Sequence, residues 1–177
     1  MSGDERLRLF LALRMPADVL GEIERWQREQ LPSVRLVRRE HLHVTLAFLG
    51  HRPAHELDAI VEALREAAAR AWRIRLTLVR YRETRSVGML VLEDEGGRAT
   101  ALAGDLQGRL EGLGVYRREE RQWLPHVTVA RWRERPRLRP ESPPQRTFVP
   151  SDAAAYLSRL HPDGARYEVV ESVALGG

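Results

Sequence analysis

The chain contains no cysteine, no lysine and no asparagine among its 177 residues. The lack of cysteine excludes disulfides, thiolate zinc sites and a cysteine nucleophile. No apolar run approaches the ~20 residues that a membrane-spanning helix needs. No Gly-rich phosphate loop is present either, because Gly96-Gly97 alone indicates only a turn, so nothing in the sequence points to ATP or another nucleotide cofactor.

What remains is the composition of a soluble globular protein, with 43% hydrophobic and 31% charged residues. The length predicts one domain or two small lobes. The N-terminal stretch MSGDERLRLFLALRMP has only a short apolar segment between arginines, so we expect a first strand there, no secretory signal and a cytoplasmic protein.

All 29 basic residues are arginines, and the formal net charge is +4. The arginine side chain presents a planar fork that binds phosphate in bidentate fashion. The basic residues are concentrated between Tyr116 and Arg139, where eight arginines face three glutamates. A basic stretch is often only a solvated face, but beside a phosphate site it indicates a polyanionic partner such as RNA.

One five-residue phrase occurs twice, as His-Val-Thr-Leu-Ala at 43–47 and His-Val-Thr-Val-Ala at 126–130. On a strand, residues two apart share a face, so His43 would point with Thr45, and His126 with Thr128. The apolar residues between them would point to the opposite face, into a core. Coincidence of two ordinary strand histidines is the simpler interpretation, but polar residues on half-buried strands usually have a reason.

Two imidazoles and two hydroxyls around one cleft suit chemistry on a phosphate. One imidazole takes a proton, the other gives one, and the hydroxyls hold the oxygens. We therefore expect His43 and His126 to be catalytic and Thr45 and Thr128 to bind substrate. The chemistry needs no metal.

The hydrophobic periodicity alternates strands and helices along the whole chain. It predicts strands at 6–14, 34–38, 42–49, 73–82, 87–93, 126–132, 153–160 and 166–174, and helices at 16–30, 53–71 and 97–112. Gly50 is expected to break the strand at 42–49, and the proline-rich residues 134–147 to form a loop. Pro162-Asp163-Gly164 is a turn signature between the last two strands.

The two motif copies lie 83 residues apart in similar surroundings, which suggests an internal duplication. We therefore predict an α+β fold over residues 1–177. It would be a single domain of two pseudo-symmetric lobes, each an antiparallel sheet flanked by helices, with the motifs facing each other across a central groove.

The chain resembles the two-histidine (2H) phosphoesterases, and more narrowly their LigT/ThpR group of RNA 2′,3′-cyclic phosphodiesterases or 2′-5′ RNA ligases. The resemblance rests on Arg8–Leu13 followed by Pro16, on 42–50, on 125–131 and on the ending 158–167. Two positions depart from the group's pattern, since Leu36 stands where Trp is frequent and Leu124 where Arg is frequent.

The resemblance implies metal-independent hydrolysis of 2′,3′-cyclic phosphate RNA ends to 2′-phosphates, with no cofactor. It implies that His43 protonates the departing 3′ oxygen and that His126 activates water. Arg131 resembles a position that contacts phosphate, but strict alternation puts it on the face opposite His126, so the strand has to end or bulge there. The reverse reaction, 2′-5′ RNA ligation, uses the same groups.

Other candidates carry weaker signals. Tyr116, Trp123 and Trp132 are possible stacking surfaces for a base, with core packing as the alternative. His41 shares a face with His43, and His161 adjoins a turn. His51 and His55 have the i, i+4 spacing of a helical zinc pair but no third ligand, so we expect no metal site.

Two other functions stay open on sequence grounds. One is a phosphodiesterase for another small cyclic phosphate, such as a cyclic nucleotide or ADP-ribose 1″,2″-cyclic phosphate, or for 2′-5′ oligoadenylate. The other is a non-catalytic RNA-binding protein that keeps the fold. We expect a monomer whose partner is RNA or a related nucleotide and not a membrane.

Overall fold

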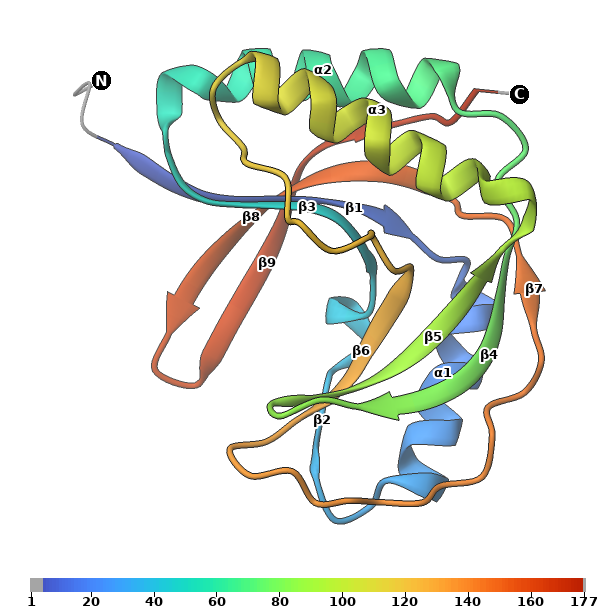
Figure 1. The fold of residues 1–177 in the computed structure, drawn as a ribbon. Helices are drawn as coiled ribbons and strands as arrows, with labels where there is room; N and C mark the ends of the chain where they lie inside the picture. The colour runs from blue at the N-terminus through green and yellow to red at the C-terminus, as the bar shows by residue number, and fades with distance from the viewer. Residues whose placement is uncertain (1–4, 177) are drawn as a thin grey trace.

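A mixed α+β architecture with three α-helices and a nine-stranded antiparallel sheet is described over residues 5–176 in a computed structural model (Figure 1). The strands run as β1 (Arg6–Arg14), β2 (Arg35–Leu36), β3 (Val44–Pro53), β4 (Leu76–Glu83), β5 (Val87–Asp94), β6 (His126–Arg131), β7 (Thr147–Phe148), β8 (Asp152–His161) and β9 (Gly164–Val173). The helices are α1 (Ala17–Gln30), α2 (Leu57–Arg70) and α3 (Arg98–Gly112), with 3-10 turns η1 (Arg39–His41), η2 (Ala54–Glu56) and η3 (Glu95–Gly97).

The sheet divides into two halves that meet at the motif strands. Its order is β7-β4-β5-β6-β3-β1-β8-β9, with β2 added beside β6. β3 and β6 share a single antiparallel pair, Val44 with Val127. Helices α2 and α3 lie over the half formed by β3, β1, β8 and β9, while α1 packs on the half that contains β6, β5 and β4 (Figure 1). The predicted α+β fold is therefore confirmed.

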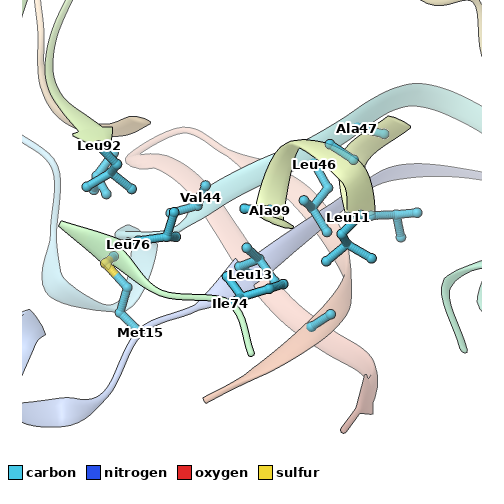
Figure 2. Packing of buried hydrophobic residues seen from close by; sticks show 14 of the residues in the cluster. Leu11, Leu13, Met15, Val44, Leu46, Ala47, Ile74, Leu76, Leu92 and Ala99 are labelled. Carbon is cyan, nitrogen blue, oxygen red and sulfur yellow. The ribbon is translucent and has the colours of Figure 1, made fainter. Parts of the chain in front are cut away.

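The apolar faces of the helices form part of the core. α1 buries Val19, Ile23 and Trp26, and α2 buries Ile60 and Leu64. Figure 2 shows how side chains from both halves meet in one cluster. One half contributes Leu11 and Leu13 of β1 and Val44 and Leu46 of β3. The other contributes Leu76 of β4, Leu92 of β5 and Ile74, which precedes β4. This shared core fixes the position of each motif strand relative to the other.

The expectation that Gly50 ends its strand was wrong. β3 continues through Gly50 to Pro53, and Gly50 adopts φ +67°, which glycine tolerates without steric cost. The pairing with β1 shifts there, because Leu9 pairs with Gly50 and Phe10 with Phe48, which leaves Leu49 without a partner. Gly50 therefore allows a bulge inside the strand instead of a break.

Smaller differences concern element ends. The strand expected at 34–38 shrinks to Arg35–Leu36, and the helix expected from residue 53 begins at Leu57 after a 3-10 turn. The proline-rich stretch is a loop up to its last residue, Thr147, where β7 adds two residues to the edge of β4. Among the described residues, no helix is both long and apolar enough to cross a membrane.

Candidate active site

The two motifs face each other across a local twofold relation. Val44 and Val127 form the pair that joins β3 to β6, and both are fully buried. The antiparallel register at this pair sets His43 across from Thr128 and Thr45 across from His126. Because side chains alternate along a strand, all four polar side chains lie on the face opposite the two valines.

Each motif strand carries a bulge at the fourth motif residue. On β3, Leu11 pairs with Ala47 and Ala12 with Thr45, so Leu46 is the extra residue. On β6, Gly88 pairs with Ala130 and Met89 with Thr128, so Val129 is the extra residue. A bulge shifts the alternation of the strand by one residue.

Two buried glutamines hold the backbone of these bulges. Gln107 of α3 donates its Nε2 hydrogen to the carbonyl of Leu46 at 2.9 Å. Gln27 of α1 donates to the carbonyl of Val129 at 2.8 Å and also to that of Val37 at 2.9 Å. A buried carbonyl without a donor is costly, so these amides stabilise the irregular geometry that the site requires.

The bulges decide which side chains reach the site. After Leu46, Ala47 is also buried and Phe48 turns outward, and after Val129, Ala130 is buried and Arg131 turns outward. Arg131 thereby lines the same cleft as His43, Thr45 and Thr128. The condition under which Arg131 was expected to reach the site, a bulge in its strand, is met.

Both imidazoles are held by the same backbone contact. Nδ1 of His43 lies 2.7 Å from the carbonyl of His41, and Nδ1 of His126 lies 2.8 Å from that of Leu124. A carbonyl only accepts, so each Nδ1 carries the proton and each neutral ring has a bare Nε2. The Thr45 hydroxyl donates to Nε2 of His43 at 2.9 Å.

His43 packs against an aromatic cluster made of Phe10, Tyr156 and Tyr167. Its ring centroid lies 4.8 Å from that of Phe10, 6.0 Å from Tyr156 and 5.9 Å from Tyr167. Burial, and to a smaller extent the nearby charge of Arg131, lower the pKa of His43 to about 4, against the carbonyl of His41, which favours the charged ring. His43 is therefore neutral at pH 7 in the free protein.

Two clefts meet at these side chains. The His43 cleft has a volume of about 1030 Å³, and its walls include His43, Thr45, Thr128, Arg131 and the β8–β9 hairpin from Leu160 to Tyr167. The His126 cleft has a volume of about 910 Å³, and its walls include His126, Thr45, Met89 and Trp123. Thr45 and Phe48 line both clefts, so a phosphate held there would be reached from two sides.

The other aromatic and histidine candidates differ in their relation to the two clefts. Tyr116 and Trp123 line the His126 cleft, and Trp123 also donates to the carbonyl of Thr45 at 3.1 Å. Trp132 packs against Gly88 and donates to the carbonyl of Thr84 at 3.2 Å, which is a structural role. His41 stacks near Tyr167, with centroids 4.2 Å apart, and its pKa is lowered by burial.

The histidines away from the motifs show no metal-binding arrangement. Within residues 5–176, no cluster of three or more His, Asp or Glu side chains could hold a metal ion. His51 and His55 are both exposed, and His161 lies on the wall of the His43 cleft at the hairpin end.

Several site residues escaped the sequence reasoning. The aromatic cluster is signalled by alternation in β1, where Phe10 lies on the face opposite Leu9 and Leu11. Arg35 and Arg38 line the His43 cleft, and within the described residues neither they nor Arg131 pairs with a carboxylate. No local pattern distinguishes these arginines from solvated ones, because the cleft forms only in the fold.

A sheet with two opposed His-x-Thr strands at its centre is the arrangement of a two-histidine phosphoesterase. The family model described as the 2′-5′ RNA ligase superfamily matches residues 15–161. The chain therefore belongs to the 2′-5′ RNA ligase superfamily, whose members are 2H phosphoesterases, as its motifs predicted.

Individual relatives cover almost the whole chain. A Methanocaldococcus jannaschii protein named RNA 2′,3′-cyclic phosphodiesterase is 23% identical over 175 residues, which are 93% of this chain and 99% of that protein. The crystal structure of TT0787 of Thermus thermophilus is 27% identical, with 97% and 99% of the two chains covered and a TM-score of 0.84. Escherichia coli LigT complexed with 3′-AMP, at 24% identity, 98% and 100% coverage and a TM-score of 0.84, shares the fold.

Proposed function

We propose that this protein hydrolyses 2′,3′-cyclic phosphate ends of RNA to 2′-phosphates by acid–base catalysis between His43 and His126, without a metal ion. The observation that carries the proposal is the opposed pair of His-x-Thr strands, whose four polar side chains share one face. The name of the M. jannaschii relative supports the same substrate class.

The proposed reaction is an in-line displacement at phosphorus. His126 takes a proton from water through its bare Nε2, the new P–O bond forms, and the P–O3′ bond breaks on the opposite side. His43 gives a proton to the departing O3′, which leaves the phosphate on O2′. Thr45 and Thr128 donate to the non-bridging oxygens, where negative charge increases in the transition state.

The acid role of His43 requires that substrate change its protonation. In the free protein, burial and the charge of Arg131 keep its pKa at about 4. A phosphate bound between Thr45 and Thr128 brings a negative charge beside both groups, which raises the pKa of His43 and offsets Arg131. We infer that the acid form is created mainly by substrate binding.

The arginines favour an RNA strand over a mononucleotide. Arg35, Arg38 and Arg131 line the His43 cleft without carboxylate partners in the described part of the chain. A mononucleotide cyclic phosphate has a single anionic group, whereas an RNA end offers further phosphates along the strand. We therefore propose that the RNA body lies in the His43 cleft.

A 31P NMR time course tests the reaction. The substrate is a short RNA ending in a 2′,3′-cyclic phosphate, with EDTA present, and the proteins are the wild type, His43→Ala and His126→Ala. We expect the cyclic signal of the wild-type reaction to become a 2′-phosphomonoester. Each substitution should lower the rate roughly 10²–10⁴-fold, as the loss of a general acid or base does.

The matched control is His55→Ala, an exposed histidine outside both clefts, which should keep the wild-type rate. A 3′-phosphate product would contradict the assignment of the leaving oxygen. Loss of activity in EDTA, restored by a divalent cation, would contradict the metal-free mechanism. No turnover by the wild type, with RNA binding that survives the double His→Ala variant, would support the binding-protein alternative.

A further inference from the structure

Arg131 lies where β6 ends, and a loop follows it up to β7. Its backbone pairs with Val87 of β5 on one side and with Arg35 of the two-residue strand β2 on the other. A strand end with few neighbours opens easily unless further contacts hold it. The place of the Arg131 guanidinium in the His43 cleft therefore depends on what fastens the residues that follow it.

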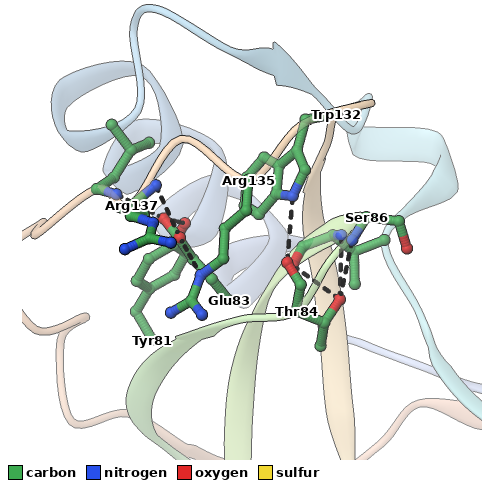
Figure 3. A network of polar contacts seen from close by, with 9 residues as sticks. Tyr81, Glu83, Thr84, Ser86, Trp132, Arg135 and Arg137 are labelled. Carbon is green, nitrogen blue, oxygen red and sulfur yellow. Dashed lines mark hydrogen bonds and ion pairs between the residues drawn. The ribbon is translucent and has the colours of Figure 1, made fainter.

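Trp132, the next residue, is fastened to the loop between β4 and β5. Its backbone amide donates to the carbonyl of Ser86 at 3.1 Å. Its Nε1 donates to the carbonyl of Thr84 at 3.2 Å (Figure 3). The Thr84 hydroxyl accepts from the backbone amides of Ser86 and Val87, so this loop is itself closed. A Cβ at Gly88 would lie 2.8 Å from the Trp132 ring, so only glycine at that position lets the ring pack there.

The carboxylate of Glu83, at the end of β4, holds the chain a few residues further on. One oxygen accepts from the amide of Leu138 at 2.7 Å, and the other accepts from the amide of Arg137 and Nε of Arg135, both at 3.0 Å (Figure 3). The Tyr81 hydroxyl donates to the first oxygen at 2.9 Å. The Glu83 side chain is 3% exposed, and its four acceptor sites are all used.

This network fixes the conformation of the loop. Burial by itself raises the pKa of Glu83, but the hydrogen bonds from Arg135 and the loop amides outweigh it and lower the pKa overall. The carboxylate is therefore charged at neutral pH, and its hydrogen bonds are the stronger, charge-assisted kind. They hold Arg137 at φ +58°, a left-handed conformation that a residue other than glycine keeps only when its surroundings impose it.

The fastening contacts lie behind the site. Tyr81 and Trp132 pack against the hydrophobic core, whereas Arg131 lines the His43 cleft on the other side of the sheet. Neither Glu83 nor Trp132 is among the residues that line the two clefts. A substrate held in these clefts is therefore out of reach of both side chains.

We infer that Glu83 and Trp132 are positioning residues for Arg131: from behind the sheet they fix the chain that leaves this arginine, and they thereby direct its guanidinium toward a phosphate of the RNA. This inference rests on the proposed function, in which the RNA lies in the cleft that Arg131 lines. A buried ion pair adds little net stability compared with apolar packing, so the contribution of this network is its geometry. Fixing the arginine beforehand lowers the entropy that is lost when RNA binds.

A binding measurement tests the inference without any turnover. The probe is a short fluorescent RNA that ends in a 2′-phosphate, and its Kd is measured by anisotropy at low and at high salt. The variants are Glu83→Gln, Trp132→Phe, Arg131→Ala and the two double variants that include Arg131→Ala. In Glu83→Gln an NH2 group replaces one oxygen and faces two donors, so two hydrogen bonds are lost. Trp132→Phe keeps an aromatic ring and removes the bond to Thr84.

The expected result is a coupled loss of affinity. Arg131→Ala should raise Kd roughly tenfold at low salt, and Glu83→Gln and Trp132→Phe roughly three- to tenfold. All three should show a weaker salt dependence than the wild type, because each loses the same phosphate contact. Each double variant should bind within about twofold of Arg131→Ala, since residues that act through one contact are not additive.

The matched control is Asp94→Asn, at the opposite end of the hairpin formed by β4 and β5. Asp94 also accepts from two backbone amides, those of Ala99 at 3.0 Å and Thr100 at 2.7 Å. This variant should keep the wild-type salt dependence and a Kd within about twofold of the wild type. Combined with Arg131→Ala, its effect should multiply with that of the arginine variant.

The outcomes separate this inference from the proposed function. Double variants that bind several-fold more weakly than Arg131→Ala would show independent effects and overturn the inference, as would an unchanged salt dependence in Glu83→Gln. If melting curves show that one variant does not fold, the other decides, because Glu83 and Trp132 hold the loop through separate bonds. If the coupling is found but the wild type does not hydrolyse a cyclic phosphate RNA, the proposed function fails and the positioning of Arg131 stands. If Arg131→Ala binds like the wild type, the inference fails whatever the hydrolase activity.

Discussion

The two motif strands share a backbone and differ in their surroundings. Both have an imidazole bound to the carbonyl two residues earlier, a bulge at the fourth motif residue and a buried glutamine on the bulged carbonyl. They differ in what surrounds the histidine and in the residue that directly follows the five-residue motif. The comparison separates the features that both copies share from those that give each histidine its own surroundings.

The differences are chemically large. His43 packs against Phe10 and accepts from Thr45, whereas among residues 5–176 no side chain donates to Nε2 of His126. The residue directly after the motif is the aromatic Phe48 on β3 and the cationic Arg131 on β6. One backbone plan thus presents two imidazoles in different electrostatic environments, which is what an acid–base pair requires.

The largest expected effect concerns the buried environment of His43. Its native pKa of about 4 lies below the unfolded value of about 6.5, so between these values the unfolded chain binds more protons. Stability should therefore fall as the pH drops from about 6.5 to about 4, by up to ~3 kcal/mol from this group. Urea unfolding at several pH values measures the effect.

The control for the pH effect removes a different histidine. His43→Gln should lose this component, so that its stability falls less between about pH 6.5 and about pH 4 than that of the wild type. His55→Gln, at an exposed position, should follow the wild-type curve. Parallel curves for wild type and His43→Gln would mean that His43 is not desolvated in the folded state.

The next largest effect concerns the buried glutamines that hold the two bulges. Gln27→Leu removes hydrogen bonds to the carbonyls of Val37 and Val129, and Gln107→Leu removes one to Leu46. We expect a loss of about 2–3 kcal/mol for the first and about 1–2 kcal/mol for the second. Urea unfolding measures both, and the exposed Gln145→Leu is the control, with a change within about 0.5 kcal/mol.

Equal losses for the two glutamine variants would show that the Val37 contact adds nothing. Losses no larger than that of Gln145→Leu would show that solvent or backbone rearrangement satisfies the bulged carbonyls.

The smallest expected effect concerns the residue directly after each motif, Phe48 or Arg131. Arg131→Ala should lower kcat/KM for a cyclic phosphate RNA by roughly tenfold at low salt, and by less at high salt, because salt screens the charge. Phe48→Ala should have an effect that does not depend on salt. Arg133→Ala removes an exposed arginine two residues further on and should change nothing. A salt-independent loss for Arg131→Ala would contradict a phosphate contact.

The sequence allowed the motif strands and the helices to be predicted, because each depends on local periodicity. His43, Thr45, His126 and Thr128 lie together as the alternation of strands requires. Arg131 needed one more fact, the bulge at Val129, which strict alternation does not provide.

The remaining site residues depend on contacts that span the chain. The environment of His43 joins Phe10 with Tyr156 and Tyr167, and no local pattern relates positions so far apart. In the sequence, Gln27 and Gln107 are ordinary polar residues of predicted helices. Their burial follows only from the orientation of α1 and α3 against the bulged strands. These pairings are tertiary, so periodicity alone could not reveal them.

The bulge at Val129 also sets which side of the strand every later residue faces. If residues 126–131 alternated strictly, with no bulge and no residue removed, Ala130 would face the cleft and Arg131 would be directed into the core. The bulge adds one core-facing residue, so Val129 and Ala130 are both buried and Arg131 returns to the cleft side. The same sequence forced into a regular register would therefore bury a charge in the core beneath the strand.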